Sequence, residues 1–258
     1  MNENGTPAAP GTSQTEEELF RQANLGGWKT VLEDPCTSDW TDRWFLDGEV
    51  AAVRNGPGGM QLTAGPRFGE DAHHMVLWTR ESFSGDLRIE YDYTRLDFES
   101  RCVNILYVQA TGSGTAPWKT DIAEWSELRR KPSMKLYFNH MRLYHISYAA
   151  FGNSNDDPGD DYIRARRYAP EGTGLNGTDL EPDYFRTGLW APGVPHHITV
   201  IKRAGEISMR VENPEQVRYC HWKDPADAPI EAGRIGLRQM FTRSARYADF
   251  RISQPGEA

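Results

Sequence analysis

The stretch HITVIKRAGEISMRVEN, from His197 to Asn213, has the pattern of a β-hairpin. Apolar and β-branched residues alternate with polar ones on both sides of Gly205, which lies in the turn. Similar short runs recur from about Asn24 onward, separated by Gly, Pro, Asn and Asp. Only TEEELFRQAN and DIAEWSELRR have the composition of helices. Because helices do not alternate with the strands, the sequence predicts an all-β fold, an antiparallel β-sandwich or jelly roll.

The length and composition indicate one globular domain. The chain has 258 residues, of which 38% are hydrophobic and 26% are charged, and β-sandwiches of this size often form a single unit. The first residues, MNENGTPAAPGTSQTEEE, are almost entirely polar or small, which is typical of a flexible segment. We therefore predict a flexible N-terminal tail over residues 1–23 and a single jelly-roll domain over residues 24–258.

Charge and cysteine content argue against several classes of partner. The formal net charge of −8 leaves no basic excess for nucleic acid or an anionic membrane surface, and no run approaches the roughly 20 apolar residues of a membrane span. The first residues lack a positive segment followed by an apolar core, so we expect a cytoplasmic location. Cys36, Cys102 and Cys220 are too few and too scattered for a disulfide framework or a zinc site, and we interpret them as structural thiols.

The stretch MRLYHISYAAFGN, residues 141–153, predicts a strand with polar groups on both faces. Alternation places on one face Leu143, His145 and Ser147. It places on the other Tyr144, Ile146 and Tyr148. Since each face mixes apolar bulk with groups that can donate, accept or move a proton, we interpret this strand as a working surface. The alternative is packing, with the histidine bonded to a backbone carbonyl.

The run DLRIEYDYTRL, residues 86–96, separates apolar from charged residues more cleanly. Its apolar face carries Leu87, Ile89, Tyr91 and Tyr93. Its charged face carries Arg88, Glu90 and Asp92. This charged face either meets solvent, which is the commoner arrangement in antiparallel sheets, or lines a concave sheet that holds a polar ligand.

Several segments together resemble one bacterial family. They are WFLDGE near Trp44, HHMVLWTRESFSGDLRIEYDY from His73, LYHISYAAFGN from Leu143, GRIGLRQM from Gly233 and YADFRI from Tyr247. In this order they resemble the YesU-like family, a domain of unknown function. The resemblance implies a concanavalin A-like lectin/glucanase jelly roll. It also implies an association with bacterial use of plant polysaccharides, notably rhamnogalacturonan.

Hydrolysis of a glycosidic bond needs two carboxyl groups at a defined separation. Glu90 and Asp92 share a strand face, but the third acid of the usual glucanase motif is missing after them. Asp121, Glu124 and Glu127 are spaced three apart, which does not place them on one strand face. Glu90 and Asp92 therefore remain the candidate pair for a glycoside hydrolase.

Elimination from a uronate needs a group that neutralises the carboxylate, a base for the C5 proton and an acid for the leaving oxygen. The pKa of histidine lies near the operating pH, and nearby cations can lower the pKa of tyrosine. We predict His145 or His74 as the base and Tyr148 or Tyr144 as the acid. The side chains predicted to hold the carboxylate or hydroxyls are Arg238, Gln239, Asn104 and Arg88. Within GRIGLRQM, alternation places Gln239 on the face of Ile235 and Leu237, and Arg238 on the opposite face.

Two further features are candidates for sugar or metal binding. Trp118 and Trp125 lie in a polar segment and are predicted to be aromatic platforms at the rim of a cleft, with core packing as the alternative. The loop NSNDDPGDD, residues 153–161, offers hard oxygen ligands that suit calcium, although its spacing does not match an EF-hand. We predict no cofactor, with a structural calcium ion in this loop as the alternative to an acidic surface turn.

These features favour a carbohydrate-active enzyme that binds an oligosaccharide of plant or algal type on a concave sheet. The leading hypothesis is β-elimination of a uronate-containing glycan such as a rhamnogalacturonan fragment. The alternatives are a glycoside hydrolase that uses a carboxylate pair and a non-catalytic, lectin-like binding module. In a cytoplasmic setting, the substrate would be an imported oligosaccharide rather than intact polymer.

Overall fold

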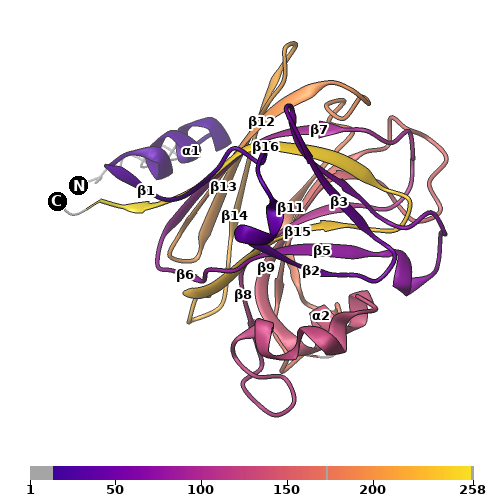
Figure 1. The fold of residues 1–258 in the computed structure, drawn as a ribbon. Coiled ribbons are helices and arrows are strands. Elements are labelled where there is room, and N and C mark those ends of the chain that lie inside the picture. Colours follow the sequence, from indigo (N-terminus) through magenta and orange to yellow (C-terminus); the bar gives the residue numbers. More distant parts are fainter. Residues whose placement is uncertain (1–13, 173, 257–258) are drawn as a thin grey trace, which may run out of the picture.

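Two antiparallel sheets packed face to face make up the body of the protein in the computed structural model, which describes residues 14–172 and 174–256 (Figure 1). Sheet A contains β1 (Trp28–Asp34), β3 (Ala52–Gly56), β4 (Gly59–Thr63), β7 (Leu87–Arg95), β12 (Pro195–Arg203), β13 (Glu206–Glu212), β14 (Val217–Lys223) and β16 (Ser244–Pro255). Their spatial order is β14-β13-β12-β7-β16-β4-β3, and β1 pairs with β16.

Sheet B contains β2 (Trp44–Asp47), β5 (Met75–Thr79), β6 (Phe83–Ser84), β8 (Asn104–Gly112), β9 (Met141–Ala150), β10 (Tyr162–Tyr168), β11 (Asp179–Phe185) and β15 (Ala232–Gln239). Their order is β11-β10-β9-β8-β15-β5-β2, and β6 pairs with β15. The chain crosses repeatedly between the two sheets, so strands that are neighbours in space are often distant in sequence. The predicted antiparallel β-sandwich is confirmed.

The predicted hairpin is the β12–β13 pair. Its register runs from His197 opposite Glu212 to Arg203 opposite Glu206. Ala204 and Gly205 form the turn between them. Alternation along such strands buries one face of each sheet between the layers. Examples are Ile89 of β7 and Ile146 of β9, both fully buried in the shared core, where each such side chain contributes about 1.5–3 kcal/mol relative to exposure.

The outer face of sheet B is covered in part by residues 113–140, which we call the cover segment. It contains the 3₁₀ helix η3 (Ile122–Arg129) and the helix α2 (Met134–His140), and α2 packs against β9 and β10 (Figure 1). The predicted helix DIAEWSELRR corresponds to η3, which is kinked at Trp125. A second apolar cluster forms beneath this cover, so sheet B is buried on both faces there.

One buried carboxylate ties the cover segment to the sheet. Oδ2 of Asp47, at the end of β2, accepts hydrogen bonds from Arg129 Nε at 2.6 Å, Trp78 Nε1 at 2.7 Å and the Tyr137 hydroxyl at 2.9 Å. Arg129 and Asp47 are both fully buried. Since burial alone would strongly disfavour either charge, each depends on the other and on these hydrogen bonds.

The N-terminal segment is folded where the structure describes it. Helix α1 (Glu16–Asn24) begins with a capping box formed by Thr15 and Glu18. Its buried Phe20 packs against Tyr219 of β14. The predicted tail over residues 1–23 therefore overlaps a helix that belongs to the folded body, while residues 1–13 lie outside the described part. The helical pattern of TEEELFRQAN is confirmed.

Short 3₁₀ turns η1 (Trp40–Asp42) and η2 (Asp71–His73) complete the elements.

Cys36, Cys102 and Cys220 are buried and form no disulfide with one another, which agrees with a structural role. In residues 14–172 and 174–256, no helix is long and apolar enough to cross a membrane.

Candidate functional site

A pocket opens on the outer face of sheet B beside the cover segment. Its volume is about 260 Å³, just below the usual range of small-molecule sites. We call it the outer-face pocket. Its walls are Val103, Met134, His145, Ser147, Asn153, Tyr162, Arg164, Arg166, Tyr168, Leu175 and Met240.

His145 lies in the wall of this pocket between two hydroxyl groups. Its Nδ1 is 2.5 Å from the Tyr168 hydroxyl, and its Nε2 is 2.6 Å from Ser147 Oγ. Burial, reinforced by the positive charges of Arg166, Arg238 and Arg164, lowers the pKa of His145 well below its usual range. The imidazole is therefore neutral at pH 7 and has one nitrogen that accepts and one that donates.

The two hydrogen bonds that link Ser147, His145 and Tyr168 can both point in either of two directions. In one, Ser147 donates to Nε2 while Nδ1–H donates to the Tyr168 oxygen, which leaves the phenolic proton free for a ligand. In the other, Tyr168 donates to Nδ1 and Nε2–H donates to Ser147 Oγ. Because burial raises the pKa of Tyr168 well above its usual value, despite the opposing charges of Arg166 and Arg238, the phenol keeps its proton. The arrangement can thus move a proton between its ends without forming a net charge.

Two arginines line the pocket, and each forms an ion pair with an aspartate. Nε of Arg164 lies 2.8 Å and 2.9 Å from the carboxylate oxygens of Asp183. Arg166 lies 2.9 Å from Asp179 and also donates to Thr178. Both aspartates belong to the neighbouring strand β11. Their carboxylates hold the guanidinium groups of the two arginines in place along β10.

Sequence reasoning did not select Tyr168, Arg164 or Arg166. The register places Arg166 opposite His145 and Arg164 opposite Ser147, so these residues share one face of the sheet. The signal was present in YIRARRY, where Tyr and Arg alternate with Ile163 and Ala165. That alternation shows which residues share a face, but only the β9–β10 pairing shows that they meet the histidine.

The two faces predicted for β9 are confirmed, and they separate the predicted catalytic residues. Tyr148 points into the core, where its hydroxyl lies 2.9 Å from that of Tyr247. Gln239 donates to the same Tyr247 hydroxyl at 2.8 Å, and Asn104 donates to Tyr93. These groups form a polar cluster between the sheets and do not reach the outer-face pocket.

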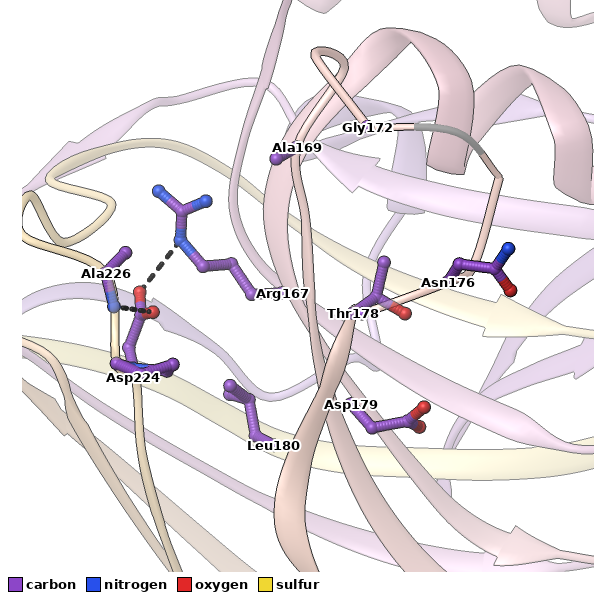
Figure 2. A pocket seen from close by; sticks show the side chains of 11 residues that line it. Arg167, Ala169, Gly172, Asn176, Thr178, Asp179, Leu180, Asp224 and Ala226 are labelled. Atoms are coloured by element: carbon purple, nitrogen blue, oxygen red, sulfur yellow. Dashed lines mark hydrogen bonds and ion pairs between the residues drawn. The ribbon is translucent and has the colours of Figure 1, made fainter.

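Tyr144 also points inward, toward the edge of the sandwich. Its hydroxyl donates to Asp224 at 2.7 Å, and Asp224 forms an ion pair with Arg167 at 2.9 Å. Figure 2 shows Arg167 and Asp224 facing each other in a separate pocket of about 250 Å³, with Thr178 and Leu180 on the opposite wall. Tyr144 and His145 therefore belong to different surfaces.

His74 and Arg238 lie near the outer face of sheet B but not in the pocket wall. His74 accepts a hydrogen bond from the Phe241 backbone and stacks on the Phe241 ring at 4.4 Å. Burial, with a contribution from Arg238, lowers its pKa to about 2. Arg238 is on the face opposite Gln239, as predicted, where its guanidinium donates to the Pro132 carbonyl at 2.6 Å and lies over the Tyr137 ring.

The predicted carboxylate pair lies on the outer face of sheet A, on the other side of the sandwich. Glu90 is 2.7 Å from Arg88, and Asp92 is 2.8 Å from Nδ1 of His197. Each acid thus has a basic partner on its own sheet. The charged face of this strand could meet either solvent or a ligand. The ion pairs and partial exposure of its residues are those of a solvated face.

The two tryptophans anchor the cover segment. Nε1 of Trp125 donates to the Lys119 carbonyl at 2.9 Å, and its ring is covered by Arg129. Trp118 is half-buried and stacks on His140 with 3.8 Å between ring centroids. Neither ring forms part of the outer-face pocket.

The acidic loop after β9 pairs largely with protein groups. Asp156 contacts Arg101, and Asp157 and Asp160 contact Arg186. Asp161 accepts hydrogen bonds from Thr187 and Gly188. Among the described residues, no three His, Cys, Asp or Glu side chains are grouped to hold a metal ion.

The two packed sheets have the jelly-roll fold of galectin-like and legume-lectin structures. A protein of unknown function with a galectin-like fold from Bacillus subtilis matches with a TM-score of 0.63 at 17% identity, covering 89% of this chain and 100% of that one. The VIP36 exoplasmic/lumenal domain in its Ca²⁺/Man3GlcNAc-bound form matches at 0.57 and 8% identity, covering 90% and 92%. Lectin I-B4 from Griffonia simplicifolia matches at 0.55 and 9% identity, covering 86% and 98%.

The chain belongs to the family described as domain of unknown function DUF1961, whose model matches residues 35–252. This confirms membership of a family of the kind that the sequence motifs indicated. No curated protein matches the sequence.

Proposed function

We propose that this protein binds an acidic oligosaccharide in the outer-face pocket and breaks it by β-elimination. The observation that carries the proposal is the Ser147–His145–Tyr168 chain, which places a neutral histidine between two hydroxyls in an open pocket. Elimination from a uronate needs a base and an acid that act together. The proposed substrate class is a uronate-containing glycan, such as a rhamnogalacturonan fragment.

The proposed step conserves protons and electrons. The C5 proton passes through the Ser147 hydroxyl to Nε2 of His145, and the C5–H electron pair becomes the C4–C5 double bond. Nδ1–H passes to the Tyr168 oxygen, and the phenolic proton goes to the leaving oxygen as the C4–O bond breaks. Tyr168, rather than Tyr148 or Tyr144, acts as the acid because its hydroxyl bonds to His145, whereas Tyr148 and Tyr144 lie on the opposite face of β9.

The composition of the pocket favours elimination over hydrolysis. In the described chain, none of the residues that line the pocket carries a carboxyl group, whereas the usual hydrolytic mechanisms need two. Asp183 and Asp179 lie nearby but are paired with Arg164 and Arg166.

A lectin-like binding role is the second candidate. Its supporting observation is that both ring nitrogens of His145 already have partners in the absence of a ligand, so the chain of hydroxyls could serve to hold Tyr168 and Ser147 as fixed hydrogen-bonding groups. VIP36, a structural neighbour at 8% identity, was solved with Man3GlcNAc bound. This role predicts saturable binding without turnover.

The test is a panel of rhamnogalacturonan, uronan and neutral oligosaccharides, measured for ultraviolet absorbance of an unsaturated uronate and for new reducing ends. Elimination predicts that both signals appear together with an acidic substrate. Substituting His145→Gln is then expected to lower kcat/KM by about 10²–10⁴. His197→Gln on sheet A is the matched control and should leave turnover unchanged. New reducing ends without absorbance would contradict elimination, and binding without either signal would favour the lectin-like role.

A further inference from the structure

Arg238 has a guanidinium group that the protein does not satisfy. The residue is fully buried, yet only Nη2 has a hydrogen-bond acceptor, the Pro132 carbonyl at 2.6 Å. Nε and Nη1 have none, and within the described residues Arg238 forms no ion pair. Removing a charge from water without a partner is costly, so an unsatisfied buried guanidinium indicates a function other than stability.

Other arginines of this region are paired. Arg129 has Asp47, Arg164 has Asp183, and Arg166 has Asp179. Their positive charges are therefore largely neutralised before any ligand arrives. Arg238 has no such partner, and its charge is felt at the pocket, where it adds to the lowering of the His145 pKa by burial and opposes the rise that burial causes in the pKa of Tyr168.

The position of Arg238 connects it to the outer-face pocket. Along the sheet, Arg238 of β15 is opposite Ile105 of β8, and Ile105 is opposite Ser147 of β9. Arg238 and Ser147 thus lie in one row on the same face, with a single strand between them. Met134 of α2 forms part of the pocket wall, and its Sδ lies 3.9 Å from the hydroxyl of Tyr107, a neighbour on the same face of the sheet.

We propose that Arg238 binds the carboxylate of the acidic sugar and thereby selects charged over neutral ligands. This inference rests on the proposed function, because it assigns the charged group of that same substrate. Nε and Nη1 are the free donor atoms and lie on different edges of the guanidinium, and a charge-assisted hydrogen bond from either of them to a carboxylate is a strong one. Met134 moves aside to admit the carboxylate, since its unbranched side chain has three rotatable bonds and adapts easily. Arg164 and Arg166 then orient hydroxyl groups rather than the charge.

The experiment compares two ligands that differ only in charge, a rhamnogalacturonan tetrasaccharide and its methyl ester, by isothermal titration calorimetry. Wild-type protein is expected to prefer the acid. Arg238→Met should weaken binding of the acid by about tenfold to a hundredfold and leave binding of the ester unchanged. Arg238→Lys keeps the charge and should retain part of the preference. Arg246→Met, at an exposed position on sheet A, is the control for net charge.

The outcomes separate this inference from the proposed function. Equal loss of both ligands in Arg238→Met, together with a lower Tm, would assign Arg238 a structural role and overturn the inference. An unchanged preference for the acid in Arg238→Met would overturn it as well. Charge-selective binding by a protein that produces no unsaturated uronate would contradict elimination while supporting the role of Arg238.

Discussion

The outer faces of the two sheets carry similar polar residues in opposite physical states. On sheet A, Glu90, Asp92 and His197 lie in contact with one another, and the His197 side chain is 38% exposed. On sheet B, His145 and Arg238 are buried beneath or beside the cover segment. The glutamate and aspartate of sheet A have basic partners, whereas in sheet B the histidine is neutral and the arginine has no counter-ion in the described chain.

A segment that covers a polar face of a sheet changes the energetics of the charges on that face. Water solvates the charges of sheet A and makes each ion pair nearly dispensable. The cover segment excludes water from part of sheet B, which strengthens electrostatic interactions there and makes an unmatched charge costly. Predictions that compare matched substitutions on the two faces therefore test this contrast directly.

The largest expected effect is on the attachment of the cover segment. Asp47→Asn removes the negative charge that faces Arg129, so it leaves a buried guanidinium without its counter-ion. We expect a loss of about 3–5 kcal/mol in the free energy of unfolding, measured by urea denaturation. Asp92→Asn on sheet A is the matched control and should change the same quantity by less than about 1 kcal/mol. Similar effects at the two positions would contradict the contrast between the faces.

A smaller effect is expected in the pH dependence of stability. His145 has a pKa below its unfolded value of about 6.5, so below that pH the unfolded chain takes up a proton that the folded chain does not. Stability therefore falls as pH falls, by about 1.4 kcal/mol per pH unit for this residue. His145→Gln should reduce the measured slope between pH 5 and 6.5 by that amount.

His197 should behave in the opposite sense. The neighbouring carboxylate of Glu90 raises the pKa of His197 against the effect of burial, and Asp92 adds to the increase. Its contribution to stability is thus complete below the unfolded pKa and is lost as pH rises through the folded value. His197→Gln should therefore remove the gain in stability that occurs as pH falls from the folded to the unfolded pKa of His197, and should leave the slope at more acid pH unchanged. If His145→Gln and His197→Gln changed the slope of stability against pH equally and with the same sign, the two histidines would share one environment.

The sequence predicted the sandwich because the signals for strands are local. Alternation placed Tyr148 and His145 on opposite faces of β9, and Gln239 and Arg238 on opposite faces of β15, and both assignments are confirmed. The family resemblance drawn from the scattered motifs is likewise confirmed.

The arrangement of the site could not be predicted in the same way. Alternation says that two residues share a face but not whether that face lies between the sheets, as it does for Tyr148 and Asn104. Pairing of β9 with β10 depends on contacts between distant residues, so Tyr168 was not connected to His145. The length of the segment after β8 gave no sign that it would fold back over Arg238 and bury it.

The smallest expected effect concerns the ion pair on sheet A. Burial alone would raise the pKa of Glu90, but His197 and Arg88 together lower it, so the carboxylate is charged at pH 7. Glu90→Gln should cost no more than about 1 kcal/mol in the free energy of unfolding, and added salt should reduce even this cost. Turnover and binding at sheet B should not change, because the sandwich core separates the two faces. If instead Glu90→Gln abolished turnover while leaving stability intact, the chemistry would belong to the carboxylates of sheet A, and the covered face would be only a scaffold.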